Sequence, residues 1–477
     1  MSGGSVSKRW SPEHAERHLR SLELFGMRFG LDRMRRMMTV LGSPQRSFET
    51  IHVVGTNGKT STTRMIAAIL ERHGLRTGSY LSPHLLSYAE RVQIGERDIE
   101  THAFAGAIAQ AAWVAERVNR TLAEDDRVTQ FELLTAAAFW ELARRGAQVV
   151  VVEAGLGGRY DATNVIDSSV AVLTNVGLEH TRWLGPTLTD IATEKLAVLD
   201  EGSVLAVGAD LQPEVLDVAR AVVEQRHARL LIAGETPAEL TLGARGSFQR
   251  ANFALARLAA ETYLDEVGGA GAPRIRRMPW TNGVRGTGGA AAGTAGMQVR
   301  EEAVRAAALS TSVPGRMQAV ARDPLTLVDS AHNPAAVAAV VESLPEMLGS
   351  RPLALVFGVL EDKDAAGMLA ALLPLCERAW FTAPPSQRAL PPATLLSLAR
   401  QLGFEQATSE ARPATALASA RSWAHARSGG AAVLACGSVY LVGDLWAHAR
   451  ELDLETGLDD TVEQDERAQS AQGRGRA

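Results

Sequence analysis

The sequence predicts an α/β protein in which two mostly parallel sheets, each flanked by helices, form separate domains. Short apolar runs alternate with longer amphipathic segments, and this alternation occurs in two successive series along the chain. Such alternation is typical of βαβ units, whose helices cover both faces of a parallel sheet. The length of 477 residues also favours two domains, because single cores seldom grow past about 250–300 residues.

The first series of apolar runs predicts the strands of the N-terminal domain. Between the first two of these strands, residues 131–145 carry apolar side chains at helical spacing, which predicts an amphipathic helix. The predicted strands are residues 51–54, 149–152, 170–174, 204–207 and 230–233.

The second series predicts the C-terminal domain, with a helix-like segment after each strand. Its strands are residues 325–328, 353–357, 379–382 and 431–435. We therefore divide the chain into a domain over 1–312, a domain over 313–453 and a disordered tail over 454–477. Residues 268–296 are rich in Gly, Ala and Arg with little periodicity, which predicts a flexible insertion.

Composition places the protein among soluble enzymes and gives no reason to expect nucleic acid or membrane as a partner. Hydrophobic residues make up 46% and charged residues 22% of the chain, and the net charge is only −5. Two cysteines fit a reducing compartment better than a disulfide framework. No signal-like start and no apolar run of about 18 residues is present. We expect a cytoplasmic enzyme.

The most informative local pattern is a glycine-rich turn between the first predicted strand and an apolar helix at 65–70. Strand, Gly-Lys-Thr turn and helix place backbone N–H groups, a helix N-terminus and an ammonium group around one point, which favours a polyphosphate. Val53 stands where the first glycine of a full Walker A motif would be. A plain strand-to-helix turn with a solvated lysine is the alternative. The candidate ATP-binding residues here are Gly55, Thr56, Asn57, Gly58, Lys59, Thr60 and Ser61.

Other polar residues are expected near the same edge of the sheet. Glu153 ends a predicted parallel strand, where α/β sheets place ligands, and a carboxylate beside a triphosphate is a natural Mg²⁺ ligand. His180 follows the next predicted strand at this edge. Ser82 precedes a proline and Lys195 lies in a helix-like segment; a simple turn and a surface lysine explain these two equally well from the residues alone.

Taken in order, the short motifs of this chain resemble those of the folylpolyglutamate synthase/dihydrofolate synthase family of Mur-type amide ligases. Each motif is weak alone, but their order over residues 11–449 is very specific. The motifs are Gly-Thr-Asn-Gly-Lys at 55–59, Ser-Pro-His-Leu at 82–85, Glu-Ala-Gly-Leu-Gly-Gly-Arg-Tyr-Asp-Ala-Thr-Asn at 153–164, Glu-His-Thr at 179–181, Gln249 with Asn252, Pro-Gly-Arg at 314–316 and Asp-Ser-Ala-His-Asn-Pro at 329–334.

The resemblance implies a P-loop-type N-terminal domain and a smaller Rossmann-like C-terminal domain that supplies the glutamate-ligase part. It also implies an ATP-dependent ligase that joins L-glutamate to a pteroyl carboxylate, either dihydropteroate or reduced folates, through an acyl phosphate. Both ATP and the carboxylate are anionic, so cations must neutralise them before they can meet. The resemblance supplies two Mg²⁺ ions, and we expect a monomer with a catalytic centre between the two domains.

The resemblance also assigns roles to individual residues. Lys59, Lys195 and His332 are the expected catalytic residues, and Lys195 matches a lysine that is carbamylated to N6-carboxylysine in this family. The expected Mg²⁺ ligands are Ser82, Glu153 and His180. Further nucleotide contacts are expected from Asn252, Arg316 and Asp329, the last two reaching across from the C-terminal domain.

Two other functions remain as alternatives. Thr60 replaces the glycine usual in folate ligases, so a Mur-type ligase of peptidoglycan precursors is the first rival. The segments 82–85 and 156–164 argue against this rival, because those ligases lack both. The second alternative is a nucleotide-binding regulatory protein, which would hydrolyse ATP without regard to glutamate or pteroate.

Overall fold

The computed structural model describes residues 10–22, 30–269, 298–427 and 430–455. The chain folds as two compact units. Unit 1 comprises residues 1–83, 87–237 and 251–307, and unit 2 comprises residues 84–86, 238–250 and 308–477. The domain boundary between residues 312 and 313 stays a prediction. Most of the insertion at 268–296 and of the tail at 454–477 lies outside the described residues.

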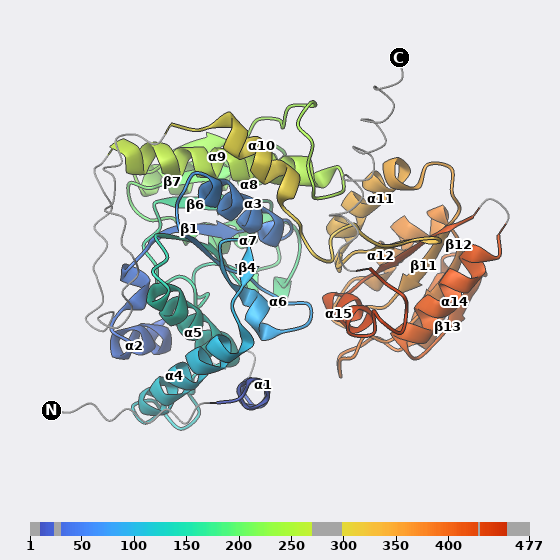
Figure 1. Ribbon diagram of the computed structural model, residues 1–477, viewed down its shortest axis with the longest axis horizontal. Coiled ribbons are helices and arrows are strands. Elements are labelled where there is room, and N and C mark those ends of the chain that lie inside the picture. The colour runs from blue at the N-terminus through green and yellow to red at the C-terminus, as the bar shows by residue number, and fades with distance from the viewer. Residues whose placement is uncertain (1–9, 23–29, 270–297, 428–429, 456–477) are drawn as a thin grey trace, which may run out of the picture. The chain divides into compact units, whose positions relative to one another are not determined.

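Unit 1 is built on an eight-stranded sheet with the order β4-β3-β2-β5-β1-β6-β7-β8 (Figure 1). The six strands from β2 to β8 in this order pair in parallel, and β3 and β4 add an antiparallel edge. The strands are β1 Glu49–Val54, β2 Thr77–Tyr80, β3 Val92–Ile94, β4 Arg97–Asp98, β5 Val149–Glu153, β6 Val170–Leu173, β7 Val204–Val207 and β8 Arg229–Ile232.

Helices cover both faces of this sheet. Val150 and Val152 of β5 belong to a core that includes α4 and α5, whereas Leu173 of β6 and Leu205 of β7 pack with α7 and α8. The helices are α1 Pro12–Arg20, α2 Asp32–Val40, α3 Lys59–Arg72, α4 Thr101–Asn119, α5 Gln130–Arg144, α6 Thr181–Leu184, α7 Leu188–Leu196, α8 Pro213–Gln225, α9 Phe248–Gly269 and α10 Glu301–Ser310, with short 3-10 turns at Pro44–Arg46 and Tyr88–Arg91.

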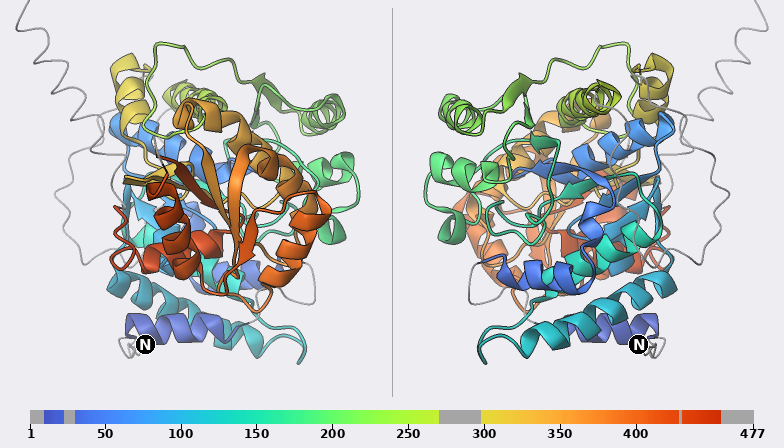
Figure 2. Two further views of the ribbon diagram at one scale, coloured as in Figure 1. Left: turned by 90° about the vertical axis from the view of Figure 1, so that its right-hand side faces the viewer. Right: turned by 90° about the vertical axis from the view of Figure 1, so that its left-hand side faces the viewer.

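Unit 2 has a six-stranded sheet with the order β13-β12-β11-β14-β10-β9, in which only β9 is antiparallel to its neighbour. The left view of Figure 2 shows its strands between helices on both sides. Its elements are β9 Gln318–Arg322, β10 Leu325–Val328, α11 Pro334–Leu348, β11 Leu353–Phe357, α12 Ala365–Leu372, a 3-10 turn at Leu373–Leu375, β12 Cys376–Phe381, α13 Pro392–Gln401, β13 Ala407–Ser409, α14 Pro413–His425, β14 Ala432–Cys436 and α15 Val439–Ala447.

The burial pattern of β11 explains how this sheet is covered. Leu355 and Phe357 pack into the core that includes α11, α12 and α13, whereas Ala354 and Val356 pack into the core with α14 and α15. Successive side chains of a strand point to opposite faces, so a strand buried on both faces must be apolar throughout. The predicted fold class, an α/β protein with parallel sheets flanked by helices, is confirmed.

Candidate active site

The glycine-rich turn joins β1 to α3 and has a backbone that only glycine adopts without strain. Gly58, directly before α3, has a φ of 81°, and a Cβ placed there would come 2.5 Å from Oδ1 of Asn252. At Gly55 a Cβ would lie 1.8 Å from Oγ1 of Thr174. Close approach and a left-handed backbone therefore both require glycine here. Asn252, predicted to contact the nucleotide, packs against this turn.

The segment after β6 holds the turn in place through hydrogen bonds. The Thr174 hydroxyl donates to the carbonyl oxygen of Asn57 at 2.6 Å, and the Asn175 side chain accepts from the N–H of Asn57 at 2.9 Å. The Thr56 hydroxyl accepts from the N–H of Gly177 at 2.9 Å. These bonds leave the turn and the N-terminus of α3 as a rigid group of backbone donors, which suits a polyphosphate.

Both predicted catalytic lysines meet at one carbonyl group of the turn. Nζ of Lys59 lies 3.1 Å from the carbonyl oxygens of Gly55 and Thr56, and Nζ of Lys195 lies 2.8 Å from that of Gly55. Lys195 is only 5% exposed. Burial, with the Lys59 ammonium as the second cause, lowers the pKa of Lys195 to about 7. The amine of Lys195 is therefore largely uncharged just above neutral pH.

Glu153, at the carboxyl end of β5, is 1% exposed and faces the same turn. Its carboxylate accepts from the Thr60 hydroxyl, 3.0 Å from each oxygen, and from the N–H of Ser82 at 3.1 Å. The structure thus brings together Glu153, Ser82 and the start of α3, as the sequence predicts. These are hard oxygen groups of the kind that Mg²⁺ prefers.

His180 lies at the N-terminus of α6 with a left-handed backbone, and its side chain is 38% exposed. Its Nε2 is 3.9 Å from a carboxylate oxygen of Glu179. In the described part of the chain, no group of three or more His, Cys, Asp or Glu side chains is arranged to hold a metal ion. The predicted ligand set contains two residues of these types, and its third member is a serine.

A cavity of about 510 Å³ opens along the loop that follows β5. One wall carries Phe131 of α5, and another carries the buried carboxylate of Asp161. Arg33 reaches this cavity in a buried ion pair, with Nε 2.9 Å from Oε1 of Glu132. The carbonyl oxygen of Lys195 lies against Gly158, so the cavity wall packs directly on α7. None of these lining residues was among the predicted site residues.

In unit 2 the predicted site residues come from two segments, the turn before β9 and the segment after β10. Asp329 is 2% exposed and accepts from the backbone N–H groups of Met317 and Ala331, each at 2.7 Å. Burial raises the pKa of Asp329, while the Arg316 guanidinium and the His332 ring act against that rise. Nδ1 of His332 is 2.9 Å from the carbonyl oxygen of Ser330. Arg316, Asp329 and His332 therefore form one cluster before α11.

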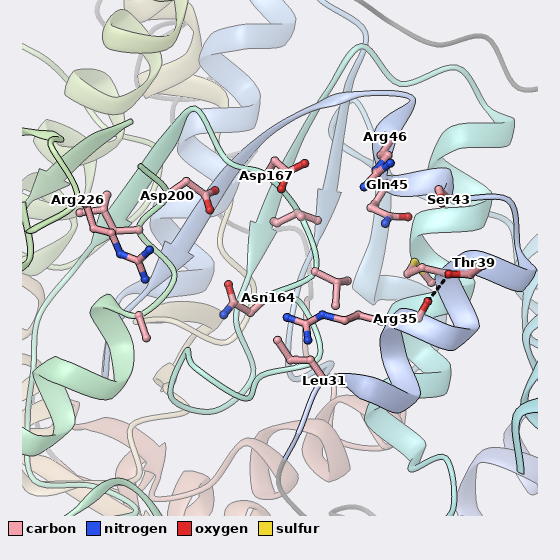
Figure 3. A pocket seen from close by; sticks show the side chains of 15 residues that line it. Leu31, Arg35, Thr39, Ser43, Gln45, Arg46, Asn164, Asp167, Asp200 and Arg226 are labelled. Atoms are coloured by element: carbon pink, nitrogen blue, oxygen red, sulfur yellow. Dashed lines mark hydrogen bonds between the residues drawn. The ribbon is translucent and has the colours of Figure 1, made fainter. Parts of the chain in front are cut away.

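A second cavity of about 500 Å³ lies at the opposite, amino-terminal edge of the unit 1 sheet (Figure 3). Its lining comes from α2 and from the segments that precede β1, β6, β7 and β8, and it includes Arg35, Asn164, Asp167, Asp200 and Arg226. It contains no predicted site residue. The candidate active site of unit 1 is therefore at the carboxyl edge, as expected for an open parallel sheet.

Comparison with known proteins identifies the family. The Mur ligase middle domain matches residues 53–210, and the Mur ligase, glutamate ligase domain matches residues 315–439. A dihydrofolate synthase/folylpolyglutamate synthase of Mycobacterium tuberculosis is 33% identical over 394 residues, which cover 76% of this chain and 75% of the relative. The chain belongs to the dihydrofolate synthase/folylpolyglutamate synthase family. The predicted resemblance is confirmed.

Solved structures of this family share the fold over nearly the whole chain. A Mycobacterium tuberculosis folylpolyglutamate synthase complexed with ADP superposes with a TM-score of 0.79 at 29% identity, covering 91% of this chain and 97% of that one. An Escherichia coli FolC in complex with DHPP and ADP gives a TM-score of 0.76 at 26% identity, covering 94% of this chain and 99% of that one. Both relatives bind a nucleotide.

Proposed function

We propose that this chain joins L-glutamate to a pteroyl carboxylate with the consumption of ATP. The terminal phosphoryl group of ATP is transferred to the carboxylate, and the glutamate amine attacks the acyl phosphate to release phosphate. Dihydropteroate and reduced folates are the proposed acceptors. The observation that carries this proposal is the phosphate-type turn held beside Glu153, in the same unit as the cavity lined by Phe131 and Asp161. Membership of the family supports the same reaction.

We assign the phosphates of ATP to the turn over Gly55–Ser61. Lys59 supports this assignment, since its ammonium group lies on the turn, 3.1 Å from the carbonyl oxygens of Gly55 and Thr56. Asn252 lies against Gly58 and is proposed to contact the nucleotide. Without Lys59 the charge of the transferred phosphoryl group is left unbalanced, which costs about a hundredfold or more in turnover.

The residues around Glu153 fit Mg²⁺. The Thr60 hydroxyl, the Ser82 segment and the buried carboxylate converge within hydrogen-bonding distance, and oxygen ligands suit this cation. His180, the third proposed ligand, comes from the loop between β6 and α6. When bound, Mg²⁺ would supply positive charge that neutralises the phosphate oxygens. That two ions bind remains part of the proposal.

We propose the cavity of about 510 Å³ for the pteroyl group. A pterin is a flat heteroaromatic ring with N–H donors along one edge. Phe131 offers an aromatic face, and Asp161 offers a buried carboxylate that accepts such donors. In the proposed reaction, the carboxyl group of a pteroate bound there is directed toward the phosphate turn.

The C-terminal unit is proposed to complete the site when the two units close on the substrates. Arg316 and Asp329 would then contact the nucleotide, and His332 would face the glutamate side. The interaction of the Asp329 carboxyl group with both Arg316 and His332 supports a joint role. The monomeric state and the cytoplasmic location remain predictions.

One assay tests the proposed function. Release of ADP is measured with ATP, Mg²⁺ and glutamate while dihydropteroate or a reduced folate is added in turn. We expect release that depends on glutamate and on either pteroyl substrate. Release that depends instead on UDP-muramyl substrates would assign the chain to the peptidoglycan ligases, a possibility that Thr60 raises. Release indifferent to glutamate and pteroate would favour a regulatory nucleotide hydrolase.

A further inference from the structure

A chain of buried hydrogen bonds runs from the central strand β1 to the wall of the proposed pteroyl cavity. It starts at His52, which is fully buried within β1. Nε2 of His52 lies 2.8 Å from Oγ1 of Thr163, and Oγ1 of Thr163 lies 2.5 Å from Oδ1 of Asp161. Thr163 and Asp161 are two residues apart, whereas His52 and Thr163 are 111 residues apart, so only the fold brings His52 to this loop.

The direction of these hydrogen bonds follows from the backbone groups around Asp161. Oδ1 also accepts from the N–H of Thr163 at 3.0 Å, and Oδ2 accepts from the N–H of Leu156 at 2.7 Å. A carboxyl group that accepts on both oxygens is best satisfied as the carboxylate. The single hydroxyl proton of Thr163 must then point to Asp161, so the hydroxyl oxygen accepts from His52.

This direction fixes the tautomer of His52. Nε2 carries the ring proton and donates to Thr163, which leaves the lone pair on Nδ1. Nδ1 is buried and has no hydrogen-bond partner among the described residues. A proton on Nδ1 would therefore have no acceptor there, which favours the tautomer with the proton on Nε2. Burial also lowers the pKa of His52 to about 3, so the ring is neutral and donates a single proton. His52 is therefore the first donor in this series of hydrogen bonds and does not accept from Thr163.

We propose that His52 and Thr163 are positioning residues that hold the Asp161 carboxylate in the orientation in which it receives the N–H donors of the pteroyl ring. The Asp161 carboxylate is held by Thr163 and by the backbone of Leu156 and Gly155, and the residue lines the cavity. Burial raises the pKa of Asp161, and these hydrogen bonds oppose that rise. This inference rests on the proposed function, because it takes the cavity as the site of the pteroyl group.

Its energetic consequence is specific to one substrate. Without the Thr163 hydroxyl the Asp161 side chain can rotate, and the ring loses a charge-assisted hydrogen bond. The lost hydrogen bond weakens binding of the ring equally in the ground state and in the transition state. KM for the pteroate therefore rises while kcat changes little. The phosphate turn keeps its own supports at Thr174 and Asn175. KM for ATP should therefore stay the same.

The test compares two pairs of variants with the wild-type protein. Thr163→Val and His52→Met remove the donors, whereas Thr163→Ser and His52→Gln keep a donor at nearly the same place. We expect the first pair to raise KM for dihydropteroate about tenfold, and the second pair to stay within about threefold of wild type. Thr326→Val is the control: it removes a buried hydroxyl that donates at 2.9 Å in unit 2 and should not change this KM.

Two readouts separate positioning from general destabilisation. Selective ¹⁵N labelling of histidine should show the His52 ring as the neutral Nε2–H tautomer at pH 7, with the signal assigned by its loss in His52→Gln. Thr163→Val should retain kcat and KM for ATP. If His52→Met does not fold, Thr163→Val and Thr163→Ser decide the question, because Thr163 lies in a loop and not in the sheet.

The outcomes are distinct. A wild-type protein that shows no glutamate- and pteroate-dependent ADP release refutes the proposed function itself. An active wild type whose Thr163→Val variant keeps an unchanged KM for pteroate overturns the positioning role alone. The same holds if Thr163→Val and Thr163→Ser raise this KM equally, or if His52 carries its proton on Nδ1.

Discussion

At Lys195 the amine lies 2.8 Å from the carbonyl oxygen of Gly55 in a buried position beside Lys59. A lysine amine reacts with CO₂ only in its uncharged form. Burial lowers the pKa of this amine from 10.5 to about 7, so the reactive form is abundant at neutral pH, unlike that of a surface lysine. The environment therefore supports the carbamylation that the family resemblance implies.

We predict that enzyme stripped of CO₂ regains activity when bicarbonate is added. Because about half of the amine is uncharged at a pH equal to its pKa and about a tenth one unit lower, recovery at constant dissolved CO₂ should slow roughly fivefold from pH 7 to pH 6 and level off above about pH 8. With ¹³C-bicarbonate, a carbamate signal should appear in the NMR spectrum of wild type and of Lys363→Met, but not of Lys195→Met. Activity indifferent to CO₂ together with a missing signal would exclude the modification.

The hydrogen bonds that link His52, Thr163 and Asp161 show why part of the site could not be predicted from sequence. The glycine-rich turn is a local pattern, so its residues and spacing predict its chemistry directly. Asp161 and Thr163 are neighbours in sequence, but only the fold brings His52 to them, and a single histidine in an apolar strand usually has a structural role. The available signal was weak: His52 is a polar residue in the otherwise apolar end of β1, next to the turn.

At the scale of elements, α3 is flanked by a glycine at each end, and the two glycines differ in their surroundings. Gly58 precedes the helix with a φ of 81°, and Gly74 follows it with a φ of 89°. A Cβ at Gly74 would meet nothing within 4 Å, whereas one at Gly58 would come within 2.5 Å of Asn252. The two positions therefore share backbone strain but differ in steric contact.

We predict that Gly74→Ala and Gly58→Ala each destabilise unit 1 by about 1 kcal/mol, because both place a side chain in the left-handed region. Only Gly58→Ala should also weaken ATP binding, by about tenfold or more, since it displaces Asn252 from the turn. Thermal unfolding and calorimetric titration with a non-hydrolysable ATP analogue measure the two effects separately. Equal ATP affinities in the two variants would show that Asn252 has no part in the nucleotide site.

Most central strands could be predicted because strands covered on both faces must be apolar, which leaves a clear signal in sequence. Predicted and observed bounds agree at 204–207, 325–328 and 353–357. Two strands that were not predicted left no such signal. The edge strand β4 has only two residues, both exposed, and the interior strand β2 consists of Thr-Gly-Ser-Tyr. These strands form because their backbones pair with adjacent strands of the sheet. A local sequence pattern does not encode this pairing.

At the scale of the whole molecule, the proposed reaction needs both units, although the phosphate turn and the pteroyl cavity belong to unit 1 alone. Unit 2 contributes Arg316 from the turn before β9, together with Asp329 and His332 from the segment after β10. A guanidinium that is half-buried beside a buried carboxylate is well oriented to bind a nucleotide. Catalysis should therefore depend on Arg316 even when unit 1 is intact.

We predict that Arg316→Ala lowers kcat/KM for ATP by at least about tenfold and leaves the thermal unfolding of both units unchanged. Arg400→Ala is the matched control, because it removes an exposed arginine from α13 of the same unit and should leave kcat/KM unaltered. Arg316→Lys should restore little, since an ammonium group cannot reproduce the planar donors of a guanidinium. If Arg316→Ala retained full activity, unit 2 would not reach the nucleotide through this residue, and the nucleotide site would lie wholly within unit 1.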